Sequence, residues 1–160
     1  MNKTEYVCCF TGHRHLPADK IDELLFQLNR TLDILIRSGV TVFRSGGALG
    51  FDTLAAFAVL DKKETNPNIR LEMCIPCKDQ AAKWTPDEID AYDQMLRRAD
   101  TVTVLHEKYT PFCMHERNRF MVDGSDYCVA FLTKETGGTA YTVNYAKKKD
   151  VKVVNLATLL

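Results

Sequence analysis

Three glycine-containing segments of this sequence have the composition of phosphate-binding turns. They read TGHR (residues 11–14), SGGALGFD (45–52) and TGGT (136–139). The last two directly precede a helical pattern, and the free N–H groups and dipole at a helix N-terminus attract anions. The chain contains neither the GxGxxG pattern of dinucleotide-binding proteins nor the GxxxxGK[ST] pattern of P-loops. The alternative interpretation is that the glycines only permit tight turns.

Basic side chains close to these turns could complete an anion site. Arg14 ends the first segment, and Arg117 and its neighbour Asn118 lie in CMHERNRFMVDGSD (113–126). The guanidinium fork of arginine binds phosphate or carboxylate through two hydrogen bonds. The same segment also fits an ordinary amphipathic helix, with residues 120–122 packed inward and its charges solvated.

Four further residues have both a binding and a structural interpretation. Asp52 begins the second predicted helix, so it could be an N-cap or could accept a hydrogen bond from a ribose hydroxyl. His13 has no nucleophile partner in the sequence, which favours contact with a ligand over proton transfer. Trp84 and Tyr109 lie in loops and could stack on a base, but core packing is the alternative, which we favour for Trp84.

Short apolar segments alternate with segments of helical period along the chain. We expect strands at 6–10, 40–43, 69–75, 101–105, 126–132 and 151–156, and helices at 20–38, 52–62, 85–100, 116–123 and 138–149. This alternation with near-continuous apolar strands is typical of a parallel sheet covered on both faces. The sequence therefore predicts one α/β domain, residues 1–160, with a doubly wound, mainly parallel, Rossmann-like sheet and helices on both faces.

The predicted fold gathers the three glycine segments at one edge of the sheet. They follow the first, second and fifth strands, and ligands of such sheets bind beyond the carboxyl ends of the strands, near the point where strand order reverses. Three donor-rich turns at one edge indicate an anion-binding site more strongly than any one of them alone.

Composition restricts the classes of partner. The 160 residues are 46% hydrophobic and 26% charged, and 21 Lys and Arg balance 21 Asp and Glu. A neutral chain has no bulk charge for binding duplex nucleic acid or an anionic membrane. The N-terminal apolar run is too short for a secretory signal, and no segment has transmembrane length. We therefore expect a cytoplasmic protein with mostly reduced cysteines.

The pair Cys74 and Cys77, in CIPC, has the spacing of redox or metal-binding cysteines. No second CxxC or His pair accompanies it at zinc-site spacing, and buried cysteine is often a small apolar residue. We favour the structural role and expect no metal site.

The motifs TGHR, SGGALGFD, RNRFMVDGSD and GGTAYTVNYA, in this order, resemble the YpsA-type branch of the SLOG superfamily. The resemblance covers essentially the whole chain. It implies a Rossmann-like fold and the binding of nucleotides or nucleotide-derived ligands, in a superfamily that includes the LOG phosphoribohydrolases and relatives of DprA. The ligand-binding residues that it implies are Gly12, His13, Arg14, Ser45, Gly46, Gly47, Asp52, Arg117, Asn118, Asp123, Gly137, Gly138 and Thr139.

The chain departs from the LOG enzymes at their catalytic glutamate. MHERNRFM is similar to their MHxRKxxM and matches Arg117 to their functional arginine, but their PGGxGTxxE is replaced by TGGTAYTVNYA. Tyr141, Val143 and Asn144 occupy the candidate positions, and none is a carboxylate, which glycosidic cleavage normally requires. If the protein is an enzyme, Arg117 and Asp52 are the candidate catalytic residues.

The resemblance and the residues together favour a sensor or regulatory module that binds a small nucleotide-like molecule, of the nucleotide, ADP-ribose or NAD type, without strong catalysis. The alternatives are a LOG-like nucleoside 5′-monophosphate phosphoribohydrolase and a DprA-like binder of single-stranded nucleic acid. The neutral charge disfavours nucleic acid as partner. Assembly into a homo-oligomer is compatible with the sequence.

Overall fold

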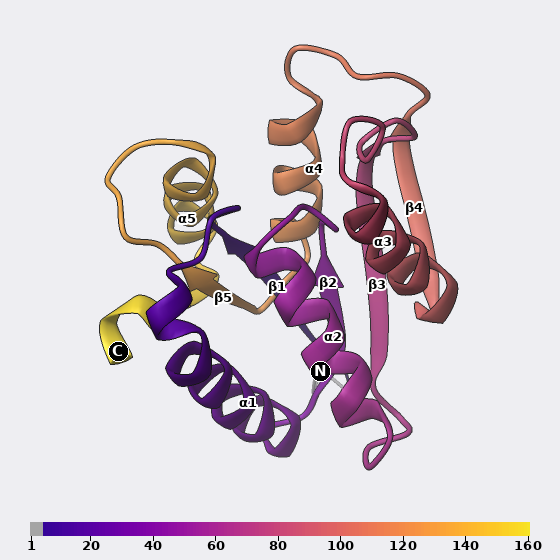
Figure 1. Ribbon diagram of the computed structural model, residues 1–160. Coiled ribbons are helices and arrows are strands. Elements are labelled where there is room, and N and C mark those ends of the chain that lie inside the picture. The colour runs from indigo at the N-terminus through magenta and orange to yellow at the C-terminus, as the bar shows by residue number, and fades with distance from the viewer. Residues whose placement is uncertain (1–4) are drawn as a thin grey trace.

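In the computed structural model, which describes residues 5–160, six parallel strands form one sheet in the order β4–β3–β2–β1–β5–β6 (Figure 1). The strands are β1 Tyr6–Gly12, β2 Val40–Ser45, β3 Arg70–Cys77, β4 Thr101–His106, β5 Tyr127–Phe131 and β6 Lys152–Asn155. The predicted Rossmann-like α/β fold is confirmed. Residues 1–4, part of the segment considered as a secretory signal, lie outside the described residues.

The helices form a layer on each face of the sheet. The helices α1 Ile21–Arg37, α2 Phe51–Lys63 and α3 Pro86–Arg98 cover one face, and α4 Cys113–Val122 and α5 Gly138–Lys148 cover the other (Figure 1). The 3-10 helix Ala18–Lys20 directly precedes α1, and a second 3-10 helix, Leu156–Leu159, follows β6. This arrangement follows from right-handed crossovers, because the chain winds outward from β1 to β4 and then returns to β5. The predicted double winding is confirmed.

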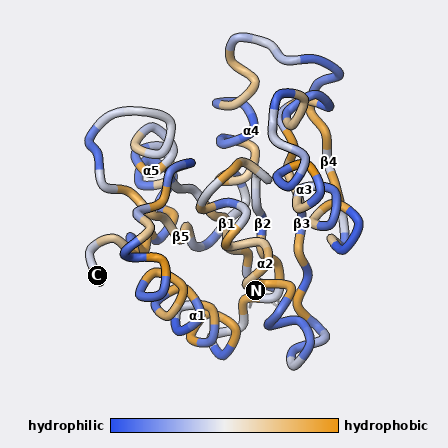
Figure 2. The backbone as a smooth tube through the Cα atoms, in the orientation of Figure 1, coloured by the Kyte–Doolittle hydropathy of each residue, from blue (hydrophilic) through white to orange (hydrophobic). Residues whose placement is uncertain are grey.

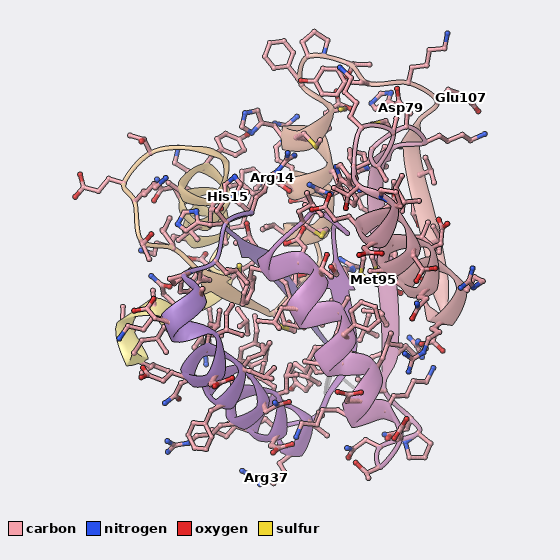
Figure 3. All side chains as sticks on the ribbon, viewed as in Figure 1. Arg14, His15, Arg37, Asp79, Met95 and Glu107 are labelled. Carbon is pink, nitrogen blue, oxygen red and sulfur yellow. The ribbon has the colours of Figure 1, made fainter. Side chains whose placement is uncertain are left out.

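Side chains alternate between two apolar cores because successive strand residues point to opposite faces. In β1, Cys8 and Phe10 belong to the large core under α1, α2 and α3, whereas Cys9 belongs to the smaller core under α4 and α5. Phe10 stacks on Phe43 at a ring-centroid distance of 6.1 Å. Figure 2 shows the apolar strands and the two-sided character of α1, and Figure 3 shows the side chains that fill the space between the layers.

Two local sequence signals fix helix ends as expected. Gly39 follows α1 in the left-handed conformation, with φ of 103°. The helix α3 begins with a reciprocal capping box: Thr85 Oγ1 accepts the Glu88 N–H at 3.2 Å, and Thr85 N–H donates to the Glu88 carboxylate at 2.9 Å.

The helix α4 differs from its prediction in start and orientation. It begins at Cys113, three residues earlier than expected, and Phe120 is 42% exposed although it was expected to pack inward. Met121 is buried as expected, and Cys113 and Arg117 are buried with it. Their spacing of four residues places them on one stripe of the helix. Arg117 thus faces the sheet, whereas the amphipathic interpretation placed it among the solvated charges.

Strand order reverses at β1, which has β2 on one side and β5 on the other. The loops that follow β1 and β5 therefore leave the same edge side by side, at the point where such sheets bind ligands. Within residues 5–160, no helix is both long and apolar enough to cross a lipid bilayer.

Candidate functional site

A cavity of about 420 Å³ lies at this reversal point. Its lining comes from the loop after β1, the start of α2, the first turns of α4 and the loop between β5 and α5. The lining residues are Thr11, Gly12, His13, Arg14, Ala48, Asp52, Met114, Arg117, Asn118, Lys134, Thr136, Gly137, Gly138 and Thr139. The structure thus brings together nine of the thirteen residues implied by the resemblance, and we call this space the anion cavity.

The N-terminus of α5 opens directly onto the anion cavity. Gly137 is the N-cap residue with φ of 102°, and Gly138 and Thr139 follow it in the first turn. A Cβ atom placed on Gly138 would meet no atom within 4 Å, so the space in front of this turn is open. The first N–H groups of a helix have no acceptor within the helix. The third glycine segment therefore has the geometry of an anion site.

Arg117 is the most unusual residue of the cavity because its guanidinium is buried, with the whole residue 4% exposed. Its Nη1 donates to the Gly46 carbonyl at 2.5 Å, and its Nε donates to Asn118 Oδ1 at 2.8 Å. Among the described residues, no carboxylate lies within 4.0 Å to form an ion pair with it. Burial lowers the pKa of Arg117, but an arginine remains protonated. A positive charge is thus buried beside the cavity, and its hydrogen-bond acceptors are neutral oxygens and the Met114 sulfur.

Gly46 makes room for this charge. A Cβ atom at Gly46 would lie 2.6 Å from Arg117 Cζ and 2.8 Å from Asp52 Oδ2. Only a residue without a side chain lets the guanidinium reach the backbone there. Gly46 does not line the cavity itself, and its role is to position Arg117.

Three amides of the second glycine segment donate to acceptors within the protein, contrary to our expectation. Gly47 N–H donates to Ser45 Oγ at 3.3 Å, and Ala48 N–H donates to Asp52 Oδ2 at 3.3 Å. Phe51 N–H, the first amide of α2, donates to the His13 carbonyl at 3.1 Å. Ser45, Gly46 and Gly47 are all outside the cavity lining. These contacts stabilise the turn before α2, whereas the turn before α5 faces open space.

Asp52 is buried, with 5% exposed, and it is the only acidic residue of the anion cavity. Burial raises the pKa of its carboxyl to about 6, although the charges of Arg117 and Arg14 and the Ala48 N–H bond act in the opposite direction. Its expected role as an N-cap is wrong, because Gly50 is the N-cap of α2. Asp52 is instead a buried acid that titrates near neutral pH.

The loop after β1 contributes two different side chains. His13 Nε2 accepts the Thr133 N–H at 2.9 Å, which fixes the loop against the segment after β5. Burial, and secondarily the charge of Lys134, lowers the pKa of His13. Arg14 is exposed, and among residues 5–160 its side chain forms no hydrogen bond or ion pair. Arg14 is therefore free to contact a ligand.

Asp123 lies at the opposite edge of the sheet, so its assignment to the site is not supported. It is the C-cap of α4, which runs from the carboxyl edge to the amino edge. Its Oδ1 accepts the Tyr145 hydroxyl at 2.8 Å, and its carbonyl accepts Arg44 Nη1 at 2.9 Å. These contacts connect α4 to α5 and to β2.

The three residues at the LOG glutamate position do not reach the anion cavity. Val143 is buried in the α5 layer, and the Tyr141 hydroxyl accepts Arg119 Nη1 at 2.8 Å. Asn144 lines a separate depression next to Leu132.

Cys74 and Cys77 are both buried, with 1% exposed, and unbridged. Burial raises the pKa of each thiol to about 12, so both are protonated at neutral pH. The described part of the chain brings together no group of three His, Cys, Asp or Glu side chains that could hold a metal ion.

Sequence reasoning missed several residues around the site. Lys134 lines the cavity without belonging to a motif, and Thr136 and Met114 line it from within TGGT and CMHERNRFMVDGSD, although neither was singled out as a site residue. Gln80 contacts the same acceptor as Arg117: its Nε2 donates to the Gly46 carbonyl at 3.2 Å. Lys134 could have been found, because a cation two residues before a predicted glycine turn belongs to the same loop.

Fold and site together define a Rossmann-like protein with an anion cavity at the reversal point of its sheet. The family model described as the YspA SLOG family (YpsA) matches residues 8–159, so the chain belongs to that family.

Among curated proteins, the chain is similar to the uncharacterized SPbeta prophage-derived protein YoqJ of Bacillus subtilis (strain 168). The two are 33% identical over 118 residues, which cover 66% of this chain and 69% of that one. A UPF0398 protein of Bacillus licheniformis is 26% identical over 138 residues, covering 82% of this chain and 75% of its own.

Among solved structures, DNA processing protein A of Helicobacter pylori, described by its single-stranded DNA binding mode, aligns with a TM-score of 0.67 at 18% identity. The alignment covers 92% of this chain and 63% of that chain. At this identity the likeness shows a shared fold.

Proposed function

We propose that this protein binds a nucleotide or a nucleotide derivative, with a phosphate group seated in the anion cavity against the N-terminus of α5. The observation that carries the proposal is Arg117, a buried guanidinium with no carboxylate within 4.0 Å among the described residues. A buried charge without a direct ion-pair partner is costly, and a bound phosphate would supply such a partner in addition to the more distant Asp52. Arg14 and Lys134 add positive charge, against Asp52 alone.

A sensor or regulatory role fits this site better than strong catalysis. The LOG-type glutamate is replaced, and the side chains at that position lie outside the cavity. Six free, buried cysteines suit a reducing compartment, which supports a cytoplasmic location.

A thermal-shift screen with AMP, ADP-ribose, NAD and ribose 5-phosphate tests the proposal. A ligand at about 100 times its Kd stabilises the folded state by about 2.7 kcal/mol, a measurable rise in Tm. We expect Gly138→Asp to lower affinity about tenfold or more, because its carboxylate would face the phosphate in open space. Gly138→Asn is the matched neutral control and should retain most binding. Absence of a shift with every ligand, or equal binding by both variants, would contradict the proposal.

Asp52 favours one alternative, the hydrolysis of a nucleoside 5′-monophosphate at its glycosidic bond. A carboxyl with a pKa of about 6 beside a buried arginine can act as a general acid or base at neutral pH. Chromatography of monophosphates incubated with the protein would detect the free base, and Asp52→Asn should abolish its release. No release from any common monophosphate removes this alternative, and a mobility shift with single-stranded oligonucleotides would instead indicate a nucleic-acid partner.

A further inference from the structure

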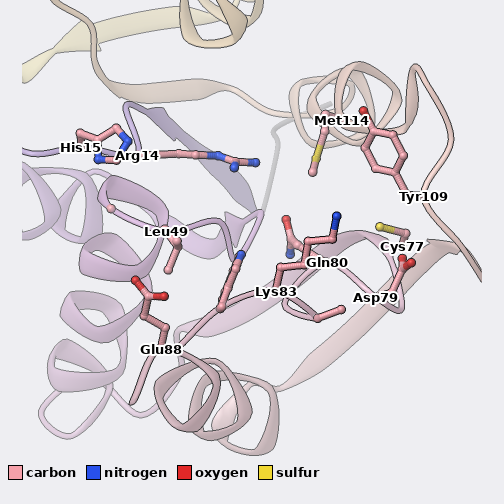
Figure 4. Close-up of a pocket in the computed structure, with 13 residues that line it drawn as sticks. Arg14, His15, Leu49, Cys77, Asp79, Gln80, Lys83, Glu88, Tyr109 and Met114 are labelled. Carbon is pink, nitrogen blue, oxygen red and sulfur yellow. The ribbon is translucent and has the colours of Figure 1, made fainter. Parts of the chain in front are cut away.

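A second and larger cavity, of about 840 Å³, adjoins the anion cavity. The two share Arg14 and Met114 as lining residues. Figure 4 shows Arg14 extending from the loop after β1 across this space, with Met114 and Tyr109 on the far side and Gln80 and Lys83 below. Its remaining wall is the segment between β3 and α3. We call this space the aromatic cavity.

The aromatic cavity offers apolar and aromatic surface. Trp84 is half-buried and packs edge-on against Tyr92, with ring centroids 5.2 Å apart. Tyr109 is 60% exposed, so its ring is accessible to a ligand. Leu49 and Met114 complete the apolar lining. Such surfaces stack on planar heterocycles.

The charges of the two cavities differ in a way that orients a ligand. The aromatic cavity adds Lys83 to the shared Arg14, but also contains Asp79 and Glu88, so its charges balance. The anion cavity has three cations, Arg14, Arg117 and Lys134, against one acid. A negatively charged group is therefore favoured in the anion cavity, and an uncharged polar ring in the aromatic cavity.

A chain of contacts connects the two cavities through their common wall. Gln80 Oε1 accepts Arg117 Nη1 at 3.4 Å, and Gln80 Nε2 lies 3.4 Å from the Tyr92 hydroxyl. The Tyr92 ring in turn contacts Trp84. Arg117, which lines the anion cavity, and Trp84, which lines the aromatic cavity, are thus connected through the same two side chains, Gln80 and Tyr92.

We propose that the aromatic cavity binds the heterocyclic base of the ligand whose phosphate occupies the anion cavity, with Arg14 at the junction between them. This inference rests on the proposed function and assigns the ligand class: a heterocycle joined to phosphate through a sugar, rather than a simple sugar phosphate. Tyr109 and Trp84 contact the ring, and Asp79 and Lys83 offer hydrogen bonds to its edge.

Trp84 is the only tryptophan of the chain, so its fluorescence reports directly on the aromatic cavity. Titrations with AMP and ADP-ribose are compared with ribose 5-phosphate and inorganic phosphate, with binding measured independently by calorimetry. We expect the two base-containing ligands to change Trp84 emission and to bind about tenfold or more tightly than ribose 5-phosphate. Ribose 5-phosphate and phosphate should bind without changing the emission.

Two variants separate the possible failures. Tyr109→Ala, at an exposed position, should weaken AMP and ADP-ribose about tenfold and leave ribose 5-phosphate unchanged. Phe120→Ala, an exposed aromatic outside both cavities, is the control and should change neither. If no phosphate compound binds the wild type, the proposed function fails. If sugar phosphates bind as tightly as nucleotides and Trp84 emission stays constant, the phosphate site stands and the base site is overturned.

Discussion

At the scale of single residues, two buried groups of opposite charge decide the character of the site. Arg117 is held by neutral oxygens, and Asp52 accepts a single backbone N–H from Ala48. Each influences the pKa of the other, yet no ion pair between them is formed. The Arg117 guanidinium therefore has no direct ion-pair partner among the described residues, as the proposed phosphate site requires.

Asp52 should make stability depend on pH in a defined window. Its pKa is about 6 in the folded chain and near 3.8 when exposed, so the folded state binds the proton more tightly. The stabilisation is fully present below pH of about 4 and is lost as pH rises through about 6, by about 3 kcal/mol in total. Urea unfolding across this range should show the free energy of unfolding of the wild type falling relative to Asp52→Asn. Asp93→Asn, at an exposed site, is the control. If the free energies of unfolding of the wild type and Asp52→Asn differ by the same amount at every pH, the raised pKa of Asp52 is contradicted.

At the scale of elements, α2 and α5 both begin after a glycine turn at the same edge of the sheet. Only the N-terminus of α5 faces open space. The first amide of α2 donates to the His13 carbonyl, whereas Gly138 at the start of α5 faces open space. Gly50, the N-cap of α2, is packed against the backbone of the first loop, and a Cβ there would lie 2.5 Å from the His13 carbonyl oxygen. The start of α2 therefore serves the fold, and the start of α5 serves the site.

This difference predicts unequal costs for the same substitution at the two N-caps. Gly50 and Gly137 both have positive φ, 79° and 102°. Gly137→Ala meets no atom within 4 Å and should cost only the strain of its backbone conformation, φ 102° and ψ −176°, about 1–3 kcal/mol in the free energy of unfolding. Gly50→Ala adds a clash with backbone that cannot move aside alone, so its cost should be clearly larger. Urea unfolding of both variants measures this, and equal costs would show that α2 and the first loop are not packed as described.

At the scale of the whole molecule, the sequence predicted the sheet better than the site. All six strands could be predicted because their apolar runs are bounded by clear turn and cap signals, such as Gly39 and the Thr85 capping box. The hydrogen bonds within the turn at 45–52 could not be predicted. They depend on the Asp52 carboxylate and the His13 carbonyl lying next to the turn's amides in the folded chain. Asp123 was misassigned although topology could have excluded it, since a residue that ends a helix before a strand lies at the amino edge.

The central claim is that the N-terminus of α5, and not the turn before α2, holds a phosphate beside Arg117. Backbone amide NMR during titration with ribose 5-phosphate tests it most directly, because this ligand has no base to bind elsewhere. We expect saturable shifts of the Gly138 and Thr139 amides, whereas those of Gly47 and Ala48 should stay nearly unchanged. Shifts confined to Gly47 and Ala48, or no saturable shift at any of the four amides, would contradict it.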